Sequence, residues 1–133
     1  MNKPIIEVAI AIIIDQGRIL ITRRKKNTHL ADLWEFPGGK RLPSESWGEC
    51  LLREVQEELG AAVKIHRSFQ RIAHDYPDRK VILQSYFCRL VGGAPRPLAS
   101  QELRWVSPEE LLSYPFPEAN LPILKALAAG TGL

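Results

Sequence analysis

Five residues between Gly39 and Gly60 have the types and spacing of a cation site built on one helix: Glu45, Arg53, Glu54, Glu57 and Glu58. At about 100° per residue, the last three acids share an arc of about 100° that adjoins an apolar arc of the same helix. Carboxylates three and four residues apart repel each other, so their clustering favours a cation among them. Hard divalent cations prefer carboxylate and carbonyl oxygens, and the sequence therefore predicts a magnesium site.

The helix that carries these acids has its own start and stop signals. Ser46 with Glu49 three residues later is typical of a capping box, and Gly60 is typical of a left-handed helix end. The expected packing face consists of Leu51, Leu52, Val55 and Leu59. An ordinary alternative is a solvated acidic face on which Arg53 and Glu57 form an i, i+4 ion pair.

The composition fits one small domain over residues 1–133. With 45% apolar residues and no polar low-complexity run, the chain can bury a single core. The apolar run at residues 8–14 is too short to cross a bilayer and lacks a signal-cleavage pattern, so it indicates a buried strand. Cys50 and Cys88 do not suggest a disulfide framework, which favours a cytoplasmic location. A redox-sensitive thiol at Cys50, one helical turn before Glu54, is a minor alternative.

The charge pattern favours an anionic partner. The formal net charge is +3, but the basic residues are scattered, so stable nucleic-acid binding is not expected. The one basic cluster, at residues 23–26, is interpreted either as a solvated loop or as a grip for a polyphosphate. A small phosphate-rich molecule, bridged by magnesium to the acidic helix, would account for both charge groups.

Hydrophobic patterning predicts two hairpins, a further strand and two helices near the C-terminus. The strands of the hairpins are expected at 7–14 with 18–23 and at 63–74 with 80–90, and residues 24–33 are expected to be a loop. The later elements are expected to be a strand at 102–106, a short helix opened by capping signals at 107–110, and a helix at 121–129. This order indicates helices packed on a mixed sheet.

The acidic segment follows a specific order: Gly39, five spacers, Glu45, seven spacers, then Arg-Glu-apolar-x-Glu-Glu-x-Gly. It resembles the Nudix box of the Nudix hydrolases at each fixed position up to Gly60, while Ala61 is smaller than the aliphatic residue usual in that family. The likeness extends over most of the chain through stretches similar to the MutT branch: ITRRKKNTHLADLWEFPGGK, DYPDRK and PFPEANLP. The resemblance implies an α+β Nudix fold, in which a mixed β-sheet lies between helices (α/β/α).

The resemblance also implies Mg²⁺-dependent hydrolysis of a nucleoside triphosphate to a monophosphate and pyrophosphate, with Mn²⁺ as a substitute. The implied metal ligands are the backbone carbonyl of Gly38 and the carboxylates of Glu54, Glu57, Glu58 and Glu102. Glu54 is the expected base, and Arg53 is expected to orient Glu45 or Glu57 by a charge-assisted bond. Glu57 and Glu102 complete the implied catalytic set. The alternative for Glu102 is an exposed glutamate at a strand edge.

The same resemblance implies that Asn120 recognises an oxidised guanine. Its amide offers a donor to the 6-oxo group and an acceptor to the N7–H that 8-oxidation creates. Asn120 also precedes the closing helix, so helix capping is the alternative interpretation. Phe36 is expected to line the base pocket, with Pro37 and Gly38 beside it. The positions expected to face the phosphates or the sugar are Arg24, His29, Glu35 and Arg79.

Three functions stay open from the sequence. The first is an 8-oxo-dGTP pyrophosphohydrolase that cleanses the nucleotide pool and so avoids mutation. The second is a related enzyme that acts on CTP, dCTP or modified pyrimidine nucleotides, whose known members tend to carry aspartate where Asn120 stands. The third is a non-catalytic 8-oxoguanine-binding module, which the complete glutamate set disfavours. For the two enzymes we expect a small nucleotide as partner, no membrane, and a monomer or weak dimer.

Overall fold

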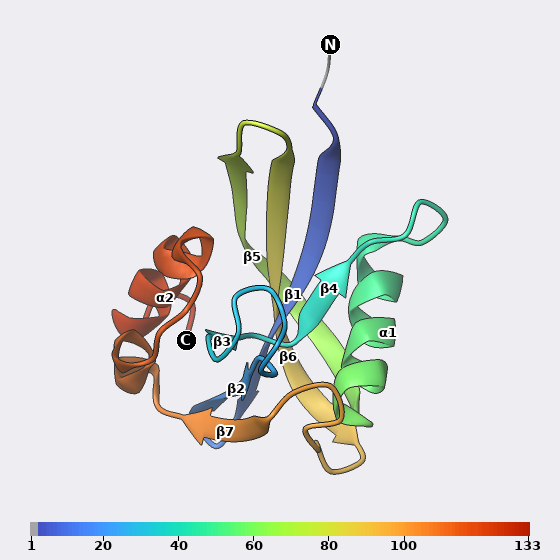
Figure 1. Ribbon diagram of the computed structural model, residues 1–133. Helices are drawn as coiled ribbons and strands as arrows, with labels where there is room; N and C mark the ends of the chain where they lie inside the picture. Colours follow the sequence, from blue (N-terminus) through green and yellow to red (C-terminus); the bar gives the residue numbers. More distant parts are fainter. Residues whose placement is uncertain (1–2) are drawn as a thin grey trace.

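A seven-stranded mixed sheet forms the centre of the computed structural model, which describes residues 3–133 (Figure 1). The elements in chain order are β1 (Ile5–Asp15), β2 (Arg18–Arg23), β3 (Trp34–Glu35), β4 (Gly38–Lys40), α1 (Trp47–Leu59), β5 (Ala62–Asp75), β6 (Lys80–Gly92), β7 (Glu102–Val106), the 3-10 helices η1 (Pro108–Ser113) and η2 (Glu118–Asn120), and α2 (Leu121–Ala128). The strands lie in the order β3-β2-β1-β6-β5, with β4 paired to β1 and β7 paired to β2.

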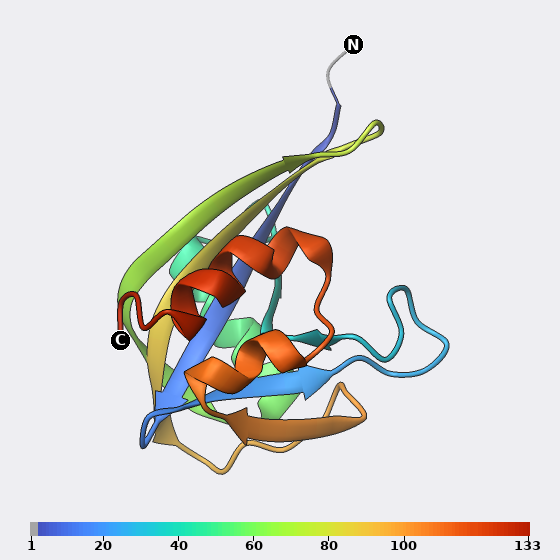
Figure 2. The ribbon, with the colours of Figure 1, turned by 90° about the vertical axis from the view of Figure 1, so that its left-hand side faces the viewer.

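Strand β1 joins the two layers of the core. It runs parallel to β6 from Ile5, opposite Lys80, to Ile13, opposite Cys88. Alternate residues of a strand point to opposite faces. Ile10 and Ile12 therefore pack with η1 and α2, whereas the neighbouring alanines and Ile13 pack against α1. Figure 2 shows α2 in front of the sheet and α1 behind it. The expected α/β/α arrangement is confirmed.

Both expected hairpins form. Residues Gln16 and Gly17 make the first turn with positive φ angles of 50° and 76°. Only the ends of β1 and β2 pair, at Ile14 with Ile19 and at Asp15 with Arg18. From Ile19 to Arg23, β2 also pairs with β7. Strands β5 and β6 pair over nearly their full length. The strand at 102–106 and the closing helix are also confirmed.

The segment before α1 differs from the expected loop and glycine turn. It contains two short strands, β3 and β4, and Gly39 pairs with Ala9 of β1. A side chain at Gly38, which has φ 149°, would bring a Cβ to 2.0 Å from the carbonyl oxygen of Ala9. Strands of two and three residues are too short to show a period-2 pattern, so the sequence did not indicate them.

Helix α1 has the expected ends. The Glu49 amide donates to Ser46 Oγ at 3.1 Å, and the Ser46 amide donates to Glu49 Oε1 at 2.8 Å. Gly60 closes the helix in the left-handed region, with φ 63°. The packing face differs from the expected one, because Leu52 is 46% exposed and Cys50 is buried instead. Among residues 3–133, no helix has the length and apolar character needed to cross a membrane.

Candidate active site

A cavity of about 350 Å³ lies where the N-terminal strands, α1 and the start of α2 meet. Its lining consists of Val8, Ile10, Arg24, Glu35, Phe36, Gly38, Gly39, Lys40, Glu54, Glu58, Leu83, Ala99, Pro117 and Asn120. Seven of these were expected at the site from the sequence: Arg24, Glu35, Phe36, Gly38, Glu54, Glu58 and Asn120. The cavity therefore joins acidic residues of α1 to an amide that lies 60 or more residues later in the chain.

Glu54 occupies the space that a side chain at Gly39 would fill. A Cβ on Gly39 would lie 2.4 Å from the carboxyl carbon of Glu54. Arg53 Nη1 donates to Glu54 Oε1 at 2.8 Å, and the Glu54 side chain is only 17% exposed. The glycine turn and the arginine together hold this carboxylate at the wall of the cavity.

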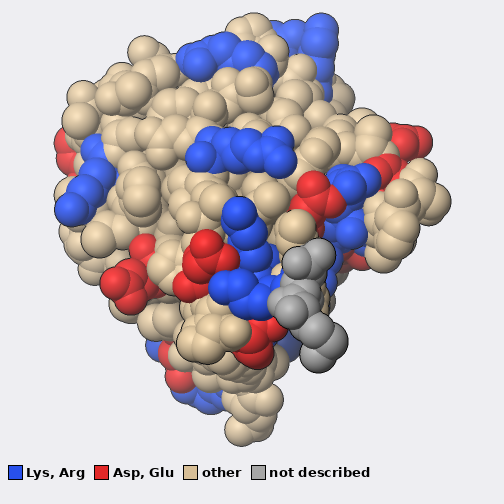
Figure 3. Space-filling model, turned by 90° about the horizontal axis from the view of Figure 1, so that it is seen from above, with Lys and Arg blue, Asp and Glu red and all other residues tan. Residues whose placement is uncertain are grey.

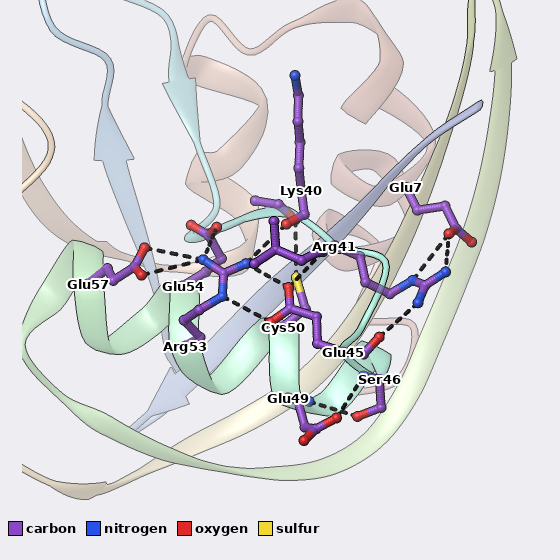
Figure 4. Close-up of polar contacts among 12 residues, drawn as sticks. Glu7, Lys40, Arg41, Glu45, Ser46, Glu49, Cys50, Arg53, Glu54 and Glu57 are labelled. Atoms are coloured by element: carbon purple, nitrogen blue, oxygen red, sulfur yellow. Dashed lines mark hydrogen bonds and ion pairs between the residues drawn. The ribbon is translucent and has the colours of Figure 1, made fainter. Parts of the chain in front are cut away.

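Arg53 lies at the centre of an ion-pair network beside the cavity (Figure 4). Its guanidinium donates to both carboxylate oxygens of Glu45, at 3.0 Å from Nε and 2.7 Å from Nη2. It also reaches the carbonyl of Lys40 at 3.1 Å and the carboxylate of Glu57 at 3.3 Å. The hydrogen bond from Arg53 is the main cause that lowers the pKa of Glu45 to about 2. Arg53 is thus fixed by Glu45 and in turn orients Glu54.

Glu58 is half-buried next to other acids. Its Oε2 accepts from the amide of Gly38 at 3.2 Å. Burial raises the pKa of Glu58 well above its ordinary value, and the neighbouring carboxylates of Glu54 and Glu35 raise it further. Two adjacent carboxylates with an adjoining backbone segment are hard oxygen donors whose mutual repulsion a divalent cation would relieve. The residues present therefore fit such an ion.

The carboxylate of Glu57 lies apart from those of Glu54 and Glu58. Its side chain is 58% exposed and pairs with Arg53 on the outside of α1. Within residues 3–133, no three carboxylate, imidazole or thiol groups are gathered closely enough to hold a metal ion as they stand. Glu57 would join Glu54 and Glu58 only by turning away from Arg53.

The structure places Glu102 away from the lining. Its carboxylate pairs with Arg23 at 3.2 Å and with Arg104 at 3.4 Å, at the start of β7. Ala99, from the preceding loop, lines the cavity instead. Glu102 was expected at the site from a single acid outside the motif, which is a weak signal. Nothing in the sequence marked Ala99 as a lining residue.

Three further expected residues also lie outside the lining. Pro37 is fully buried beneath it. The side chain of His29 is not part of the lining, although its carbonyl accepts from Arg24 Nε at 2.7 Å. Arg79 lies in the β5–β6 turn, with its guanidinium 5.1 Å from the centre of the Tyr76 ring.

Lys40 lines the cavity although the sequence analysis did not select it. Its place directly after the glycine turn was the available signal.

Asn120 reaches the cavity without capping a helix. It precedes α2 with φ −84° and ψ −9°, and its side chain makes no capping hydrogen bond. A capping residue has extended backbone angles, and its side-chain oxygen accepts a hydrogen bond from a backbone N–H of the first helical turn. The capping interpretation is therefore wrong, and the amide is free to contact a ligand.

Arg24 and Glu35 of the cavity, and the nearby thiol of Cys50, have polar environments that the structure defines. Arg24 and Glu35 form a salt bridge at 3.0 Å. Burial nevertheless raises the pKa of Glu35, since it outweighs the opposing effect of Arg24. Cys50 is buried, and desolvation together with the Glu45 charge raises the pKa of its thiol to about 11. A redox-sensitive thiol at Cys50 is therefore not supported.

Comparison with known proteins gives consistent matches. A family model described as NUDIX domain matches residues 9–126. The chain is 37% identical to the CTP pyrophosphohydrolase of Escherichia coli (strain K12) over 124 residues, which cover 93% of this chain and 92% of that protein. It is 32% identical to the 8-oxo-dGTP diphosphatase of the same strain over 123 residues, 92% of this chain and 95% of that protein.

Solved structures agree with these matches. The solution structure of the E. coli ORF135 protein superposes with a TM-score of 0.85 at 34% identity, covering 98% of this chain and 93% of that one. The crystal structure of a MutT protein from Methanosarcina mazei Go1 superposes with a TM-score of 0.84 at 27% identity, covering 100% of this chain and 99% of that one. The fold is thus shared with these proteins.

Proposed function

This chain belongs to the Nudix hydrolase family, and we propose that it hydrolyses 8-oxo-dGTP to 8-oxo-dGMP and pyrophosphate. One observation carries the proposal: a single cavity is lined by Glu54, Glu58 and Asn120, whose side-chain amide makes no helix-capping hydrogen bond. The carboxylates fit the phosphate end of such a substrate, and the amide fits its base. Removal of an oxidised nucleotide before polymerisation would avoid mutation.

Nudix hydrolases generally need a divalent metal ion, and we propose Mg²⁺, with Mn²⁺ as a substitute, for this chain. Glu54, Glu58 and the backbone of Gly38 would hold the ion, with Glu57 joining after it leaves Arg53. When bound, the ion withdraws charge from phosphate oxygens and lowers the pKa of a bound water. Glu102 is left out of this ligand set, because Arg23 and Arg104 hold its carboxylate elsewhere.

Glu54 is the proposed general base. Its carboxylate would accept a proton from the water that attacks the β-phosphorus, while the bond from that phosphorus to the α–β bridging oxygen breaks. The monophosphate leaves with the bridging oxygen, and the β- and γ-phosphates leave as pyrophosphate. Arg53 keeps one oxygen of Glu54 in a charge-assisted bond at 2.8 Å, which supports a fixed orientation during proton transfer.

Asn120 is the proposed reader of the base. Its amide nitrogen would donate to the 6-oxo group, and its carbonyl would accept from N7–H, a donor that guanine lacks until it is oxidised. Phe36 lines the same cavity and packs against Phe116 with ring centres 5.1 Å apart, which provides a rigid apolar wall. Arg24 and Glu35, which line the cavity, would contact the sugar or phosphates.

A cytidine nucleotide is the second candidate substrate. The observation that favours it is the 37% identity to a CTP pyrophosphohydrolase. The same carboxylates would serve either substrate, so the choice depends on the base. A non-catalytic binding module is disfavoured, because such a module would not need Glu54 and Glu58 beside the phosphate end of the cavity.

The deciding experiment is steady-state hydrolysis with Mg²⁺ across 8-oxo-dGTP, dGTP, CTP, dCTP, 5-methyl-dCTP and ADP-ribose, with the products identified. We expect 8-oxo-dGTP to exceed dGTP by about a hundredfold in kcat/KM, equivalent to about 2.7 kcal/mol. A preference for the cytosine nucleotides would replace the guanine-specific proposal by the second candidate. Absence of hydrolysis for every nucleotide would overturn both.

The proposal extends to the setting of the enzyme. We infer a small nucleotide as the partner, a cytoplasmic location, one domain over residues 1–133, and a monomer or weak dimer. On the face that Figure 3 shows, basic side chains are interspersed with acidic ones, which supports a small anion rather than a nucleic acid as ligand.

A further inference from the structure

Arg41 lies outside the cavity but links three parts of the chain (Figure 4). Its Nε donates to Glu7 Oε1 of β1 at 3.1 Å, and its Nη2 donates to the same oxygen. Its Nη1 donates to the backbone carbonyl of Glu45 at 2.7 Å. Its guanidinium also lies over the Trp47 ring, 5.4 Å from the ring centre. Arg41 is one of the five spacer residues between Gly39 and Glu45, so the family motif does not specify it.

Glu45, which Arg41 holds by its backbone, is the main partner of Arg53. Both oxygens of its carboxylate accept from the Arg53 guanidinium, at 3.0 and 2.7 Å. The Leu42 amide donates to Glu45 Oε1 at 2.8 Å, which further restricts this side chain. Arg53 then donates to Glu54 at 2.8 Å. A continuous series of short polar contacts therefore connects β1 to the carboxylate at the cavity wall.

We propose that Arg41 is a positioning residue, which fixes Glu54 through Glu45 and Arg53. Its connection to β1 ties the loop before α1 to the central strand of the sheet. The backbone reinforces this connection, because the Arg41 amide donates to the Glu7 carbonyl at 2.8 Å. The side chains of Arg41 and Glu7 are only 24% and 26% exposed, so solvent screens their ion pair less than a surface pair.

The proposal depends on the guanidinium as a fork. One end of Arg41 binds Glu7 while the other end binds the Glu45 carbonyl. A lysine keeps the charge but carries one compact ammonium on a flexible stem, and it cannot reproduce this planar double contact. Arg41→Lys therefore removes the two-sided hydrogen bonding of the guanidinium and keeps the positive charge. The catalytic meaning of the effect rests on the proposed hydrolysis, in which Glu54 is the base.

The first test compares kcat and KM for the preferred nucleotide. We expect Arg41→Lys to lower kcat by about ten- to a hundredfold, as for other supporting residues, with KM within about twofold. The control is Arg71→Leu, because Arg71 lies over the same Trp47 ring at 5.6 Å, whereas the loop's hydrogen bonds in the described residues involve Arg41 and not Arg71. We expect Arg71→Leu to keep the wild-type kcat. An equal loss in both variants, or a change in KM alone, would overturn the positioning role.

A second test asks whether Arg41 acts through Glu45. In a Glu45→Gln background, where the carboxylate contact with Arg53 is already weakened, Arg41→Lys is expected to lower kcat by less than about twofold further. The same full loss in both backgrounds would contradict the proposed series of contacts. If Arg41→Lys does not fold, Glu7→Gln serves in its place, because it weakens only the connection to β1.

A third readout does not need turnover. The Arg53 Nε–H signal in ¹⁵N NMR should be sharp and slow to exchange in the wild type, and broadened in Arg41→Lys but not in Arg71→Leu. An unchanged Arg53 signal in Arg41→Lys would refute the proposal. If the wild type hydrolyses no nucleotide, the proposed function fails, while this signal still decides whether Arg41 orders the network.

Discussion

The carboxyl carbon of Glu54 lies 2.4 Å from the point that a Cβ on Gly39 would occupy. Gly39→Ala would therefore push the Glu54 carboxylate away from its place beside Arg53. We expect kcat to fall by at least about a hundredfold, because a displacement of about 1 Å at a reacting group has effects of this size. The free energy of unfolding should change by only about 1 kcal/mol, since a flexible side chain can move aside.

Gly48→Ala is the matched control for Gly39→Ala. A Cβ at Gly48, inside α1, would meet only Ile65 Cδ1 at 3.6 Å, which is an ordinary contact. Alanine also favours the helix over glycine, so this variant should retain activity and gain about 0.5 kcal/mol of stability. Urea unfolding and kcat for the two variants check both expectations. Full activity in Gly39→Ala would show that the position of Glu54 does not limit the reaction.

Glu54→Gln tests the proposed base directly. The amide preserves the size of the side chain but cannot accept the proton of the attacking water, so we expect kcat to fall by several orders of magnitude. The melting temperature should stay close to that of the wild type. Glu109→Gln, at an exposed position in η1, should retain wild-type kcat and serves as the control. Near-normal turnover by Glu54→Gln would assign the base to another residue.

Asn120→Asp tests base selection. The carboxylate loses the donor for the 6-oxo group of a purine but accepts from the 4-amino group of cytosine. We expect the ratio of kcat/KM for 8-oxo-dGTP over CTP to fall by at least about tenfold. Asn120→Ala should leave stability nearly unchanged, because no capping bond is lost, whereas loss of a true cap costs about 1 kcal/mol. An unaltered substrate ratio would exclude Asn120 from base recognition.

The local part of the site was readable from the sequence. Ser46, Glu49 and Gly60 mark the ends of α1 through interactions within one turn, and the spacing of Glu54 and Glu58 fixes them on one side of that helix. The long strands also carry enough apolar residues to be recognised. These features depend on neighbours in the chain, so they were predicted with nearly correct bounds.

The parts that depend on tertiary packing were not readable. Strand β4 exists because it pairs with β1, and Glu102 turns to Arg23 and Arg104 because β7 pairs with β2. Asn120 stands where a cap is expected, yet η2 gives it helical backbone angles. For β4 and Glu102 a contact with a distant segment decides the geometry, and no local pattern encodes that contact. For Asn120 the cause is local, because η2 directly precedes α2.

Metal addition and removal should change both activity and stability. Mg²⁺ would relieve the repulsion between Glu54 and Glu58, so it should raise the melting temperature by several degrees when present well above its Kd. A chelator should remove this gain and abolish hydrolysis. The double variant Glu54→Gln with Glu58→Gln should lose the thermal shift, which differential scanning calorimetry can measure. A shift of the same size in this variant would place the bound metal elsewhere.

Glu45 should make stability depend on pH in the acid range. Its pKa is lowered from 4.5 to about 2 in the folded protein, mainly by Arg53. The unfolded chain therefore binds more protons in this window, so the stabilisation is complete above about pH 4.5 and is lost as the pH falls towards about 2. Urea unfolding at pH 5, 4 and 3 should show this decline in the wild type. Glu45→Gln should have lower stability at pH 5 and a shallower decline, because it has no proton to take up. Equal slopes for the two proteins would mean that the Arg53–Glu45 pair does not control acid stability.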